Sequence, residues 1–221
     1  MKRIGAAALR PDLSTEILTA GLRASWQTLA YASAGVSLAV VLAFPLGVLA
    51  SGVLASRRAS RILSAASFRG VLGFLRAIHE LVWAWLILAA IGLSPMTAVL
   101  ALALPYAGIL GRVLADMLHD VPDEPLHALR SAGASEWQVL LYGRIPFALA
   151  NMVSYSLYRY ECGIRSAAIM SFVGLGGLGY QITISLDDLN YNEVWTFVYC
   201  LVALVVAFEL VSAVIRRRLV T

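Results

Sequence analysis

Long runs without charge most constrain what this chain can fold into. Residues 24–56 contain no charged side chain and no histidine, and residues 81–111 are also uncharged. A helix needs about 20 predominantly apolar residues to cross ~30 Å of hydrocarbon. Of the 221 residues, 60% are hydrophobic and 14% are charged, whereas soluble domains are about 45–50% apolar and about 25% charged. The sequence therefore predicts an all-α polytopic membrane protein and excludes an ordinary soluble enzyme, a disordered chain and a disulfide scaffold.

We expect five spans. The turn signal Gly92-Leu93-Ser94-Pro95 interrupts the second uncharged run, so this run holds two spans that meet at a short loop. To be long enough, the second span must begin near Gly73, which draws Arg76, His79 and Glu80 into its first turns. The other spans are expected within Ala24–Ser56 with a kink at Pro45, and at Met96–Met117, Phe147–Val173 and Val194–Ile215. Residues 174–193 are expected to form a loop, with glycines first and acidic residues last.

The distribution of arginine predicts the orientation. Arginines occur in the loop at 57–69, in the polar segment at 112–144 and in the tail at 216–218, whereas the connections at 92–95 and 174–193 contain no Arg or Lys. Short cytoplasmic loops favour Arg and Lys. The C-terminus is therefore expected in the cytoplasm, and the N-terminus outside. The same loops account for the net charge of +4, so no nucleic-acid partner is expected.

Residues 1–23 form a basic N-terminal segment that does not fit this orientation. Lys2, Arg3, Arg10 and Arg23 would all lie on the outer side. Two explanations are open: the segment lies on a surface, or a preceding span is missing from this chain.

Two motif matches do not indicate a catalytic, metal or cofactor site here, and a third motif is absent. Gly174-x-Gly176-x-x-Gly179 matches the dinucleotide fingerprint, but that fingerprint needs a soluble strand–turn–helix context. Turns and close packing are the better interpretation of these glycines. His79-Glu80 begins like a zincin motif, but position 83 is Trp, so the second ligand is absent. The chain also has no Walker A sequence, so it is expected to bind no cofactor of its own.

Charged residues inside the expected spans are more informative, because a charge in hydrocarbon usually faces a protein interior or a polar pathway. Arg76, His79 and Glu80 stand at i, i+3 and i+4, and we expect them on one helical face. Glu161 and Arg165 are four residues apart. Two interpretations are open: ion pairs that hold helices together, or the lining of a translocation pathway. A pathway would favour an anion, because three arginines outnumber two carboxylates: Arg76, Arg159 and Arg165 against Glu80 and Glu161.

The polar segment resembles the signature loop of ABC importer permeases. It contains Ala128-Leu129-Arg130-Ser131-Ala132-Gly133-Ala134-Ser135, and Pro146 follows thirteen residues after Gly133. In that family a short cytoplasmic coupling helix docks on the ATP-binding subunit, a glycine allows the turn between two short helices, and the proline starts the return span. The resemblance implies contacts to the ATPase from Glu124, His127, Ala128, Gly133, Ala134 and Pro146. The sequence departs from the family at His127, where a Glu is expected, although Glu124 lies one turn earlier.

Four further blocks resemble the permeases of phosphonate-type importers over about residues 25–218. They are Arg76–Glu80, Ser154–Glu161, Arg165–Ala167 and the glycine-rich segment Val173–Gly179. The block around Glu161 is the most specific, because the signature loop alone indicates only the superfamily. Members of this family differ in ligand among phosphonates, phosphite, hypophosphite and phosphate.

The resemblance implies a multi-pass subunit of the bacterial inner membrane, with a permease domain at 24–218 and a coupling loop at 119–146. Its expected partners are a second permease subunit (an identical copy or a paralogue), two cytoplasmic ATP-binding subunits that use ATP and Mg, an external solute-binding protein and membrane lipid. The chain itself would be no enzyme. Two alternatives remain: a permease of a methionine- or metal-type importer, and a membrane-embedded enzyme with His79 and Glu80 as an acid–base pair.

Overall fold

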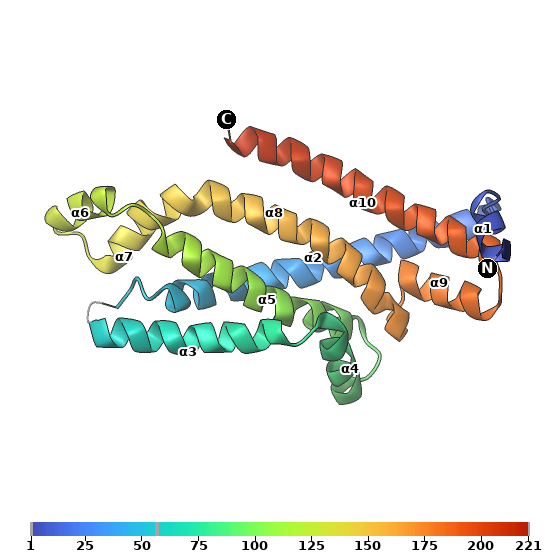
Figure 1. The fold of residues 1–221 in the computed structure, drawn as a ribbon, viewed down its shortest axis with the longest axis horizontal. Helices are drawn as coiled ribbons and strands as arrows, with labels where there is room; N and C mark the ends of the chain where they lie inside the picture. The colour runs from blue at the N-terminus through green and yellow to red at the C-terminus, as the bar shows by residue number, and fades with distance from the viewer. Residues whose placement is uncertain (1, 56–57, 221) are drawn as a thin grey trace. The chain divides into compact units, whose positions relative to one another are not determined.

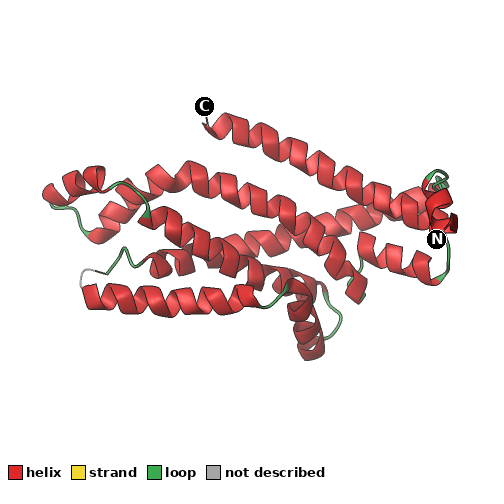
Figure 2. Ribbon diagram, in the orientation of Figure 1, coloured by secondary structure: helices red, strands yellow, loops and turns green. Residues whose placement is uncertain are grey.

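The computed structural model describes residues 2–55 and 58–220. Throughout these ranges the regular structure is helical and contains no strand (Figure 2), which confirms the expected all-α fold. The helices are α1 (Lys2–Ala8), α2 (Thr15–Ser51), α3 (Arg58–Ala77), α4 (Glu80–Ile91), α5 (Pro95–His119), α6 (Asp123–Ser131), α7 (Glu136–Val139), α8 (Ile145–Met170), α9 (Leu178–Asp187) and α10 (Tyr191–Val220), as labelled in Figure 1. A π-helical segment, Leu140–Arg144, precedes α8, and a 3₁₀ turn, Ser171–Val173, follows it.

The lengths and compositions of the helices agree with five spans. Among the described residues, three helical segments are long and apolar enough to cross a membrane alone: Thr15–Ser51, Pro95–His119 and Tyr191–Arg216. Two further pairs meet the same criterion only when each pair is counted together, namely Ala59–Ala77 with Glu80–Ile91 and Glu136–Val173 with Leu178–Asp187. Counting each pair as one span gives the five that the uncharged runs predict.

The second expected span is broken where the sequence predicts a continuous helix. Helix α3 ends at Ala77, and α4 begins at Glu80. Arg76 therefore lies in the last turn of α3, His79 lies in the break, and Glu80 is the first residue of α4. The prediction that these three side chains share one helical face is wrong. The order of charges suits the break, because a cation stabilises the C-terminus of one helix and a carboxylate the N-terminus of the next.

Residues 174–193 were expected to form a loop, but they contain helix α9. Its N-terminus is capped from another helix: the backbone N–H of Gly177 donates to Gln27 Oε1 (3.1 Å), and that of Leu178 donates to Thr28 Oγ1 (2.9 Å). Both acceptors belong to α2, about 150 residues away in sequence. No local sequence signal predicts such a cap, because Ser, Thr, Asn or Asp is the usual N-cap residue and here the position is Gly177.

The helices divide into two compact units. The first consists of residues 1–36, 80–102 and 160–214. Its core joins α2, α8, α9 and α10 through small, aliphatic and aromatic side chains. One cluster contains Ala24, Leu178, Ile182 and Phe197, and a second contains Ala32, Ile164 and Ala167.

The N-terminal segment of the first unit packs on the beginning of α10. Trp195 Nε1 donates to the carbonyl of Ile4 (2.8 Å), and Tyr199 Oη donates to that of Ala8 (2.8 Å). Thr196 Oγ1 donates to the carbonyl of Asp12 (2.8 Å). These bonds satisfy backbone acceptors of α1 and of the connection to α2, so the basic segment lies along α10. Trp and Tyr are the residues that favour membrane–water interfaces.

The second unit consists of residues 37–79, 103–159 and 215–221, and its described part includes α3, α6, α7 and the adjoining parts of α2, α5 and α8. Ala50, Leu72 and Ala115 form its buried centre. At the edge of this centre, Asp116 accepts from Arg112 Nε (3.0 Å) and from Arg69 Nη2 (3.4 Å). Arg69 Nε also donates to the carbonyl of Ala50 (3.1 Å), so one arginine links α2, α3 and α5.

The close approach of α5 to α3 depends on Gly108. A Cβ atom at this position would lie 2.7 Å from the carbonyl oxygen of Leu72 and 2.8 Å from the backbone nitrogen of Arg76. By contrast, a Cβ atom at Gly73 of α3 would meet nothing within 4 Å. Gly108→Ala should therefore destabilise the protein by about 1–3 kcal/mol through overpacking. Gly73→Ala should leave stability unchanged or raise it by up to ~1 kcal/mol through helix propensity.

Thermal unfolding of the two variants in detergent tests this difference. Since both glycines are helical, the change in helix propensity is the same, and only the steric contact differs. Equal melting temperatures for the Gly108→Ala protein and the unsubstituted protein would show that α3 and α5 do not pack as described.

Candidate functional site

The expected coupling loop contains two short helices joined by a tight turn. Helix α6 ends in a Schellman arrangement: the N–H of Gly133 donates to the carbonyl of Arg130 (2.9 Å), and the N–H of Ala134 donates to that of Leu129 (3.1 Å). Gly133 has a φ of +86°, a backbone conformation that glycine adopts without a steric penalty. The turn between two short helices is therefore formed at the glycine that the sequence singles out.

A bidentate ion pair fixes the angle between these two helices. Arg130 Nε and Nη2 donate to the two carboxylate oxygens of Glu136, each at 3.1 Å. Hydrogen bonding to Glu136 raises the pKa of the Arg130 guanidinium above its ordinary value, so the arginine stays charged at any physiological pH. A capping box between Ser135 and Gln138 begins α7. The segment is thus rigid although it is short.

Helix α6 has one buried and one open face. Leu126 is fully buried, and its side chain contacts the backbone position of Gly143. The expected coupling residues Glu124, His127 and Ala128 are exposed, and their spacing places them on one side of the helix. That side is free to meet a partner, and His127 lies at its centre.

Two expected residues and two that were not expected complete this region. Ala134 is half-buried after the turn, and Pro146 is exposed as the second residue of α8, where it closely follows the π-helical segment Leu140–Arg144. Sequence reasoning missed Trp137 and Tyr142, which are 59% and 73% exposed. Exposed aromatic side chains are typical of protein interfaces, and their position beside α6 is the signal that could have identified them.

The structure brings together three of the expected pathway residues in the first unit. Ser166 Oγ of α8 donates to Glu80 Oε1 of α4 (2.7 Å). One turn earlier on α8, Glu161 Oε1 lies 4.0 Å from Arg165 Nη2. The Glu161 side chain is only 11% exposed, whereas the Arg165 side chain is 54% exposed. The result is a largely buried carboxylate beside a guanidinium that remains open to its surroundings.

Arg159 belongs to the second unit and has an aromatic environment. Its Nε and Nη2 atoms donate to Tyr155 Oη (2.9 and 2.8 Å). The guanidinium also lies 5.3 Å from the ring centroid of Tyr155 and 5.7 Å from that of Tyr158, within the range of a cation–π interaction. Arg76 and His79 belong to the same unit and are exposed.

The glycine-rich segment forms a compact turn, as its composition indicated. Gly174, Gly176 and Gly177 have φ values of +94°, +80° and +95°. A Cβ atom at Gly179 would collide with the carbonyl of Ala168, so α9 packs directly on the backbone of α8. The interpretation as turn and close packing is confirmed.

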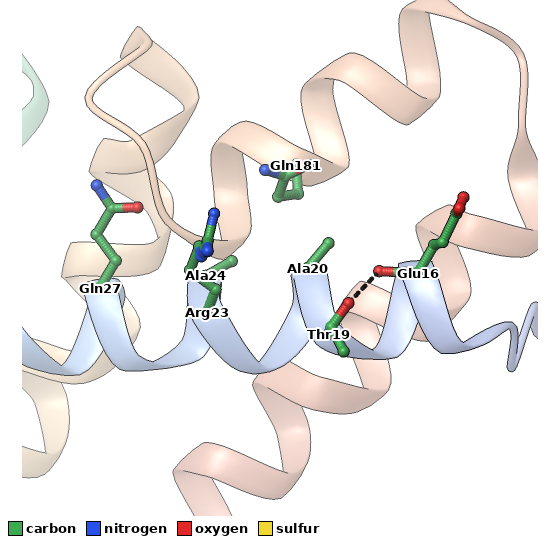
Figure 3. Close-up of a pocket in the computed structure, with 7 residues that line it drawn as sticks. All are labelled: Glu16, Thr19, Ala20, Arg23, Ala24, Gln27 and Gln181. Carbon is green, nitrogen blue, oxygen red and sulfur yellow. Dashed lines mark hydrogen bonds between the residues drawn. The ribbon is translucent and has the colours of Figure 1, made fainter.

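A polar cavity between α2 and α9 lies in the same unit and was not expected from the sequence. Figure 3 shows the side chains that line it, among them Glu16, Arg23 and Gln27 of α2 and Gln181 of α9. Its volume is about 340 Å³. Gln27 is already engaged, since it accepts from Gly177 and donates to Tyr31 Oη (3.0 Å). The sequence did not indicate this cavity, because the opposite charges of Glu16 and Arg23 balance each other.

Comparisons with known proteins identify relatives of similar sequence. The chain is 31% identical to the phosphite transport system permease protein PtxC of Stutzerimonas stutzeri over 95% of this chain and 74% of that protein. It is also 31% identical to the phosphate-import permease protein PhnE of Mycolicibacterium smegmatis, over 89% of this chain and 36% of that longer protein.

The fold is similar to that of solved importers. A structure of the inward-facing MetNI methionine ABC transporter superposes with a TM-score of 0.80, at 22% identity, over 94% of this chain and 99% of that chain. An amino acid ABC transporter gives a TM-score of 0.75 at 17% identity, over 92% and 95% of the two chains. Residues 43–221 match the model of the family described as binding-protein-dependent transport system inner membrane component, and the chain therefore belongs to that family.

Proposed function

We propose that this permease subunit serves an ATP-driven importer of a phosphorus oxyanion: phosphonate, phosphite, hypophosphite or phosphate. The observation that carries the proposal is the similarity to PtxC and PhnE, which are named for phosphite and for phosphate and are each 31% identical to this chain. The charged side chains of α8 support the same conclusion, because an anion needs cationic groups along its route.

Arg165 is the best candidate for guiding the anion. Its side chain is more than half exposed, and its ion pair with Glu161 is long, at 4.0 Å. A guanidinium held in this way can attract an oxyanion and release it again. Weak binding suits a transport route, because a deep well would slow release. Glu161 and Glu80 limit the net positive charge and orient the arginine.

Arg159 and Arg76 would extend this electrostatic guidance. The two phenol rings around Arg159 keep its guanidinium in place without neutralising it. An arginine fixed by aromatic contacts retains its charge for a passing anion, whereas a carboxylate partner would cancel it. His79 lies in the exposed break next to Arg76 and would add a further hydrogen-bond donor.

Coupling to ATP hydrolysis would pass through α6 and α7. Two cytoplasmic ATP-binding subunits, which use ATP and Mg, would close on the exposed face with Glu124, His127 and Ala128. The rigid joint at Gly133, held by the Arg130–Glu136 pair, would carry this movement to α8 through Pro146. The spans would then alternate between inward-open and outward-open states, with a second permease subunit opposite and an external binding protein delivering the solute.

The first test of this proposal is the stimulation of ATPase activity by different ligands. The complex with its ATPase and binding protein is reconstituted in liposomes and supplied with phosphite, a phosphonate, phosphate or methionine. We expect stimulation by a phosphorus oxyanion and none by methionine. Stimulation by methionine alone would overturn the ligand assignment, since likeness to MetNI at 22% identity shows only the fold.

A substitution at Gly133 tests the coupling step. Gly133→Val forces a β-branched residue to a φ of +86°, which costs about 1–2 kcal/mol in local backbone strain and should distort the joint. Space is not limiting, because a Cβ atom there would meet nothing within 4 Å. We expect ATP-driven uptake to fall at least about tenfold while the melting temperature changes little.

Gly133→Asn is the matched control, because asparagine tolerates the left-handed region better than valine does. Its uptake should lie well above that of Gly133→Val. Normal uptake by the valine variant would rule out the joint as part of the coupling route.

A substitution at Arg165 tests the electrostatic guidance. Arg165→Gln removes the exposed cation and should lower the kcat/KM of oxyanion uptake by about tenfold at low ionic strength, with a smaller effect at high salt because ions screen exposed charges. Arg165→Lys keeps the charge and should retain most of the activity. Equal losses in both variants would indicate that Arg165 acts through packing and not through its charge.

A further inference from the structure

A second polar cavity lies behind the coupling helices and is distinct from the expected pathway residues. It has a volume of about 330 Å³ and belongs entirely to the second unit. Six ionisable side chains line it: Arg61 of α3, His119 of α5, Asp123 and Arg130 of α6, Glu136 of α7 and Arg144 of the π-helical segment. One water occupies ~30 Å³ in the liquid, so a small polyatomic ion fits.

The arginines of this cavity differ in how well they are satisfied. Arg130 is fully engaged with Glu136. Arg144 is only 8% exposed, and its Nη1 atom donates to the backbone carbonyl of Leu118. Its buried Nε atom has no hydrogen-bond acceptor within the described part of the chain. Leaving a buried charged donor without an acceptor is costly, so an anion in the cavity beside this guanidinium would stabilise it.

The balance of charge indicates an anion. The Arg130–Glu136 pair cancels, which leaves Arg61 and Arg144 against the single carboxylate of Asp123. None of the carboxylates that the structure describes lies within ion-pair distance of Arg61 or Arg144. Guanidinium groups bind tetrahedral oxyanions well, because their planar array of donors matches several oxygens at once.

We propose that this cavity binds a free phosphorus oxyanion, such as orthophosphate, on the side that the arginine distribution assigns to the cytoplasm. The lining favours a free anion over a lipid headgroup, because the walls are polar apart from Val53 and Ala55 and offer little surface for an acyl chain. Bound phosphate would join the end of α5 to α6 and α7 and thereby stiffen the coupling segment. The proposal does not depend on which solute the importer carries.

Calorimetric titration of the purified permease with inorganic phosphate tests the proposal. Binding should be saturable and about tenfold or more weaker in Arg61→Gln, because one charge-assisted contact is lost. Arg144→Gln should lose binding as well. Since Arg144 is buried and its variant can fail to fold, the exposed Arg61 carries the test.

A matched control separates this cavity from other arginines. Arg10→Gln removes an exposed charge from the N-terminal segment and should bind phosphate normally. Arg61 lines this cavity and has no part in the proposed solute pathway, so a failure of the transport proposal is distinguishable from a failure here. Unchanged affinity in Arg61→Gln, or no binding by the unsubstituted protein, would overturn the proposal.

The same titration in nanodiscs distinguishes the two sources of phosphate. With a free anion as the ligand, affinity should be similar in phosphatidylcholine and in phosphatidylglycerol discs once salt has screened the lipid surface. If phosphatidylglycerol abolishes binding at high salt while phosphatidylcholine does not, a headgroup occupies the cavity and the proposal of a free anion is wrong.

Discussion

Every backbone N–H and C=O group in hydrocarbon must be hydrogen-bonded within the protein, because lipid tails offer neither donors nor acceptors. This constraint explains why the regular structure of the described residues is helical. It also explains why a helix that ends inside an apolar stretch needs hydrogen-bond partners from elsewhere in the protein. At the start of α9 the free N–H groups of Gly177 and Leu178 are bound by Gln27 and Thr28 of α2, so polar side chains of one span replace the water that would cap a soluble helix.

The charged residues of α8 face the same shortage of polar partners. Glu161, Arg165 and Ser166 lie within six residues of one helix, with Arg165 one turn after Glu161 and Ser166 as the donor to Glu80. Arg159 is accommodated differently, by two tyrosines. Ion pairing, hydrogen bonding and aromatic contacts thus each keep a charge in an apolar segment. The interpretations as structural ion pair and as pathway lining therefore do not exclude one another, because the Glu161–Arg165 pair lies within α8 at 4.0 Å and leaves the guanidinium accessible.

The expected coupling segment is stabilised differently, by contacts between residues close together in the sequence. Its short helices depend on local devices: the Schellman turn at Gly133, the capping box of Ser135 and Gln138, and the Arg130–Glu136 pair. Such devices keep a small polar element rigid without a core of its own. One face of α6 is anchored by Leu126 and the other is open, which is the arrangement that a docking element requires. Behind it, the buried Nε atom of Arg144 has no hydrogen-bond acceptor among the described residues.

The sequence by itself determined the helical class and the family and predicted five spans, because uncharged runs and the spacing of Gly133 and Pro146 are local properties. It also identified which charged residues enter apolar segments. Only the tertiary structure decided that the helix breaks at residues 78–79, that α9 exists, and that Glu80 meets Ser166 while Arg159 meets tyrosines. The start of α9 and the Glu80–Ser166 contact depend on partners far away in the sequence. The contact of Arg159 with Tyr155, four residues earlier, depends on which way the two side chains turn. Local patterns predict where a helix can form, whereas long-range hydrogen bonds and close packing select where it ends and which face it shows.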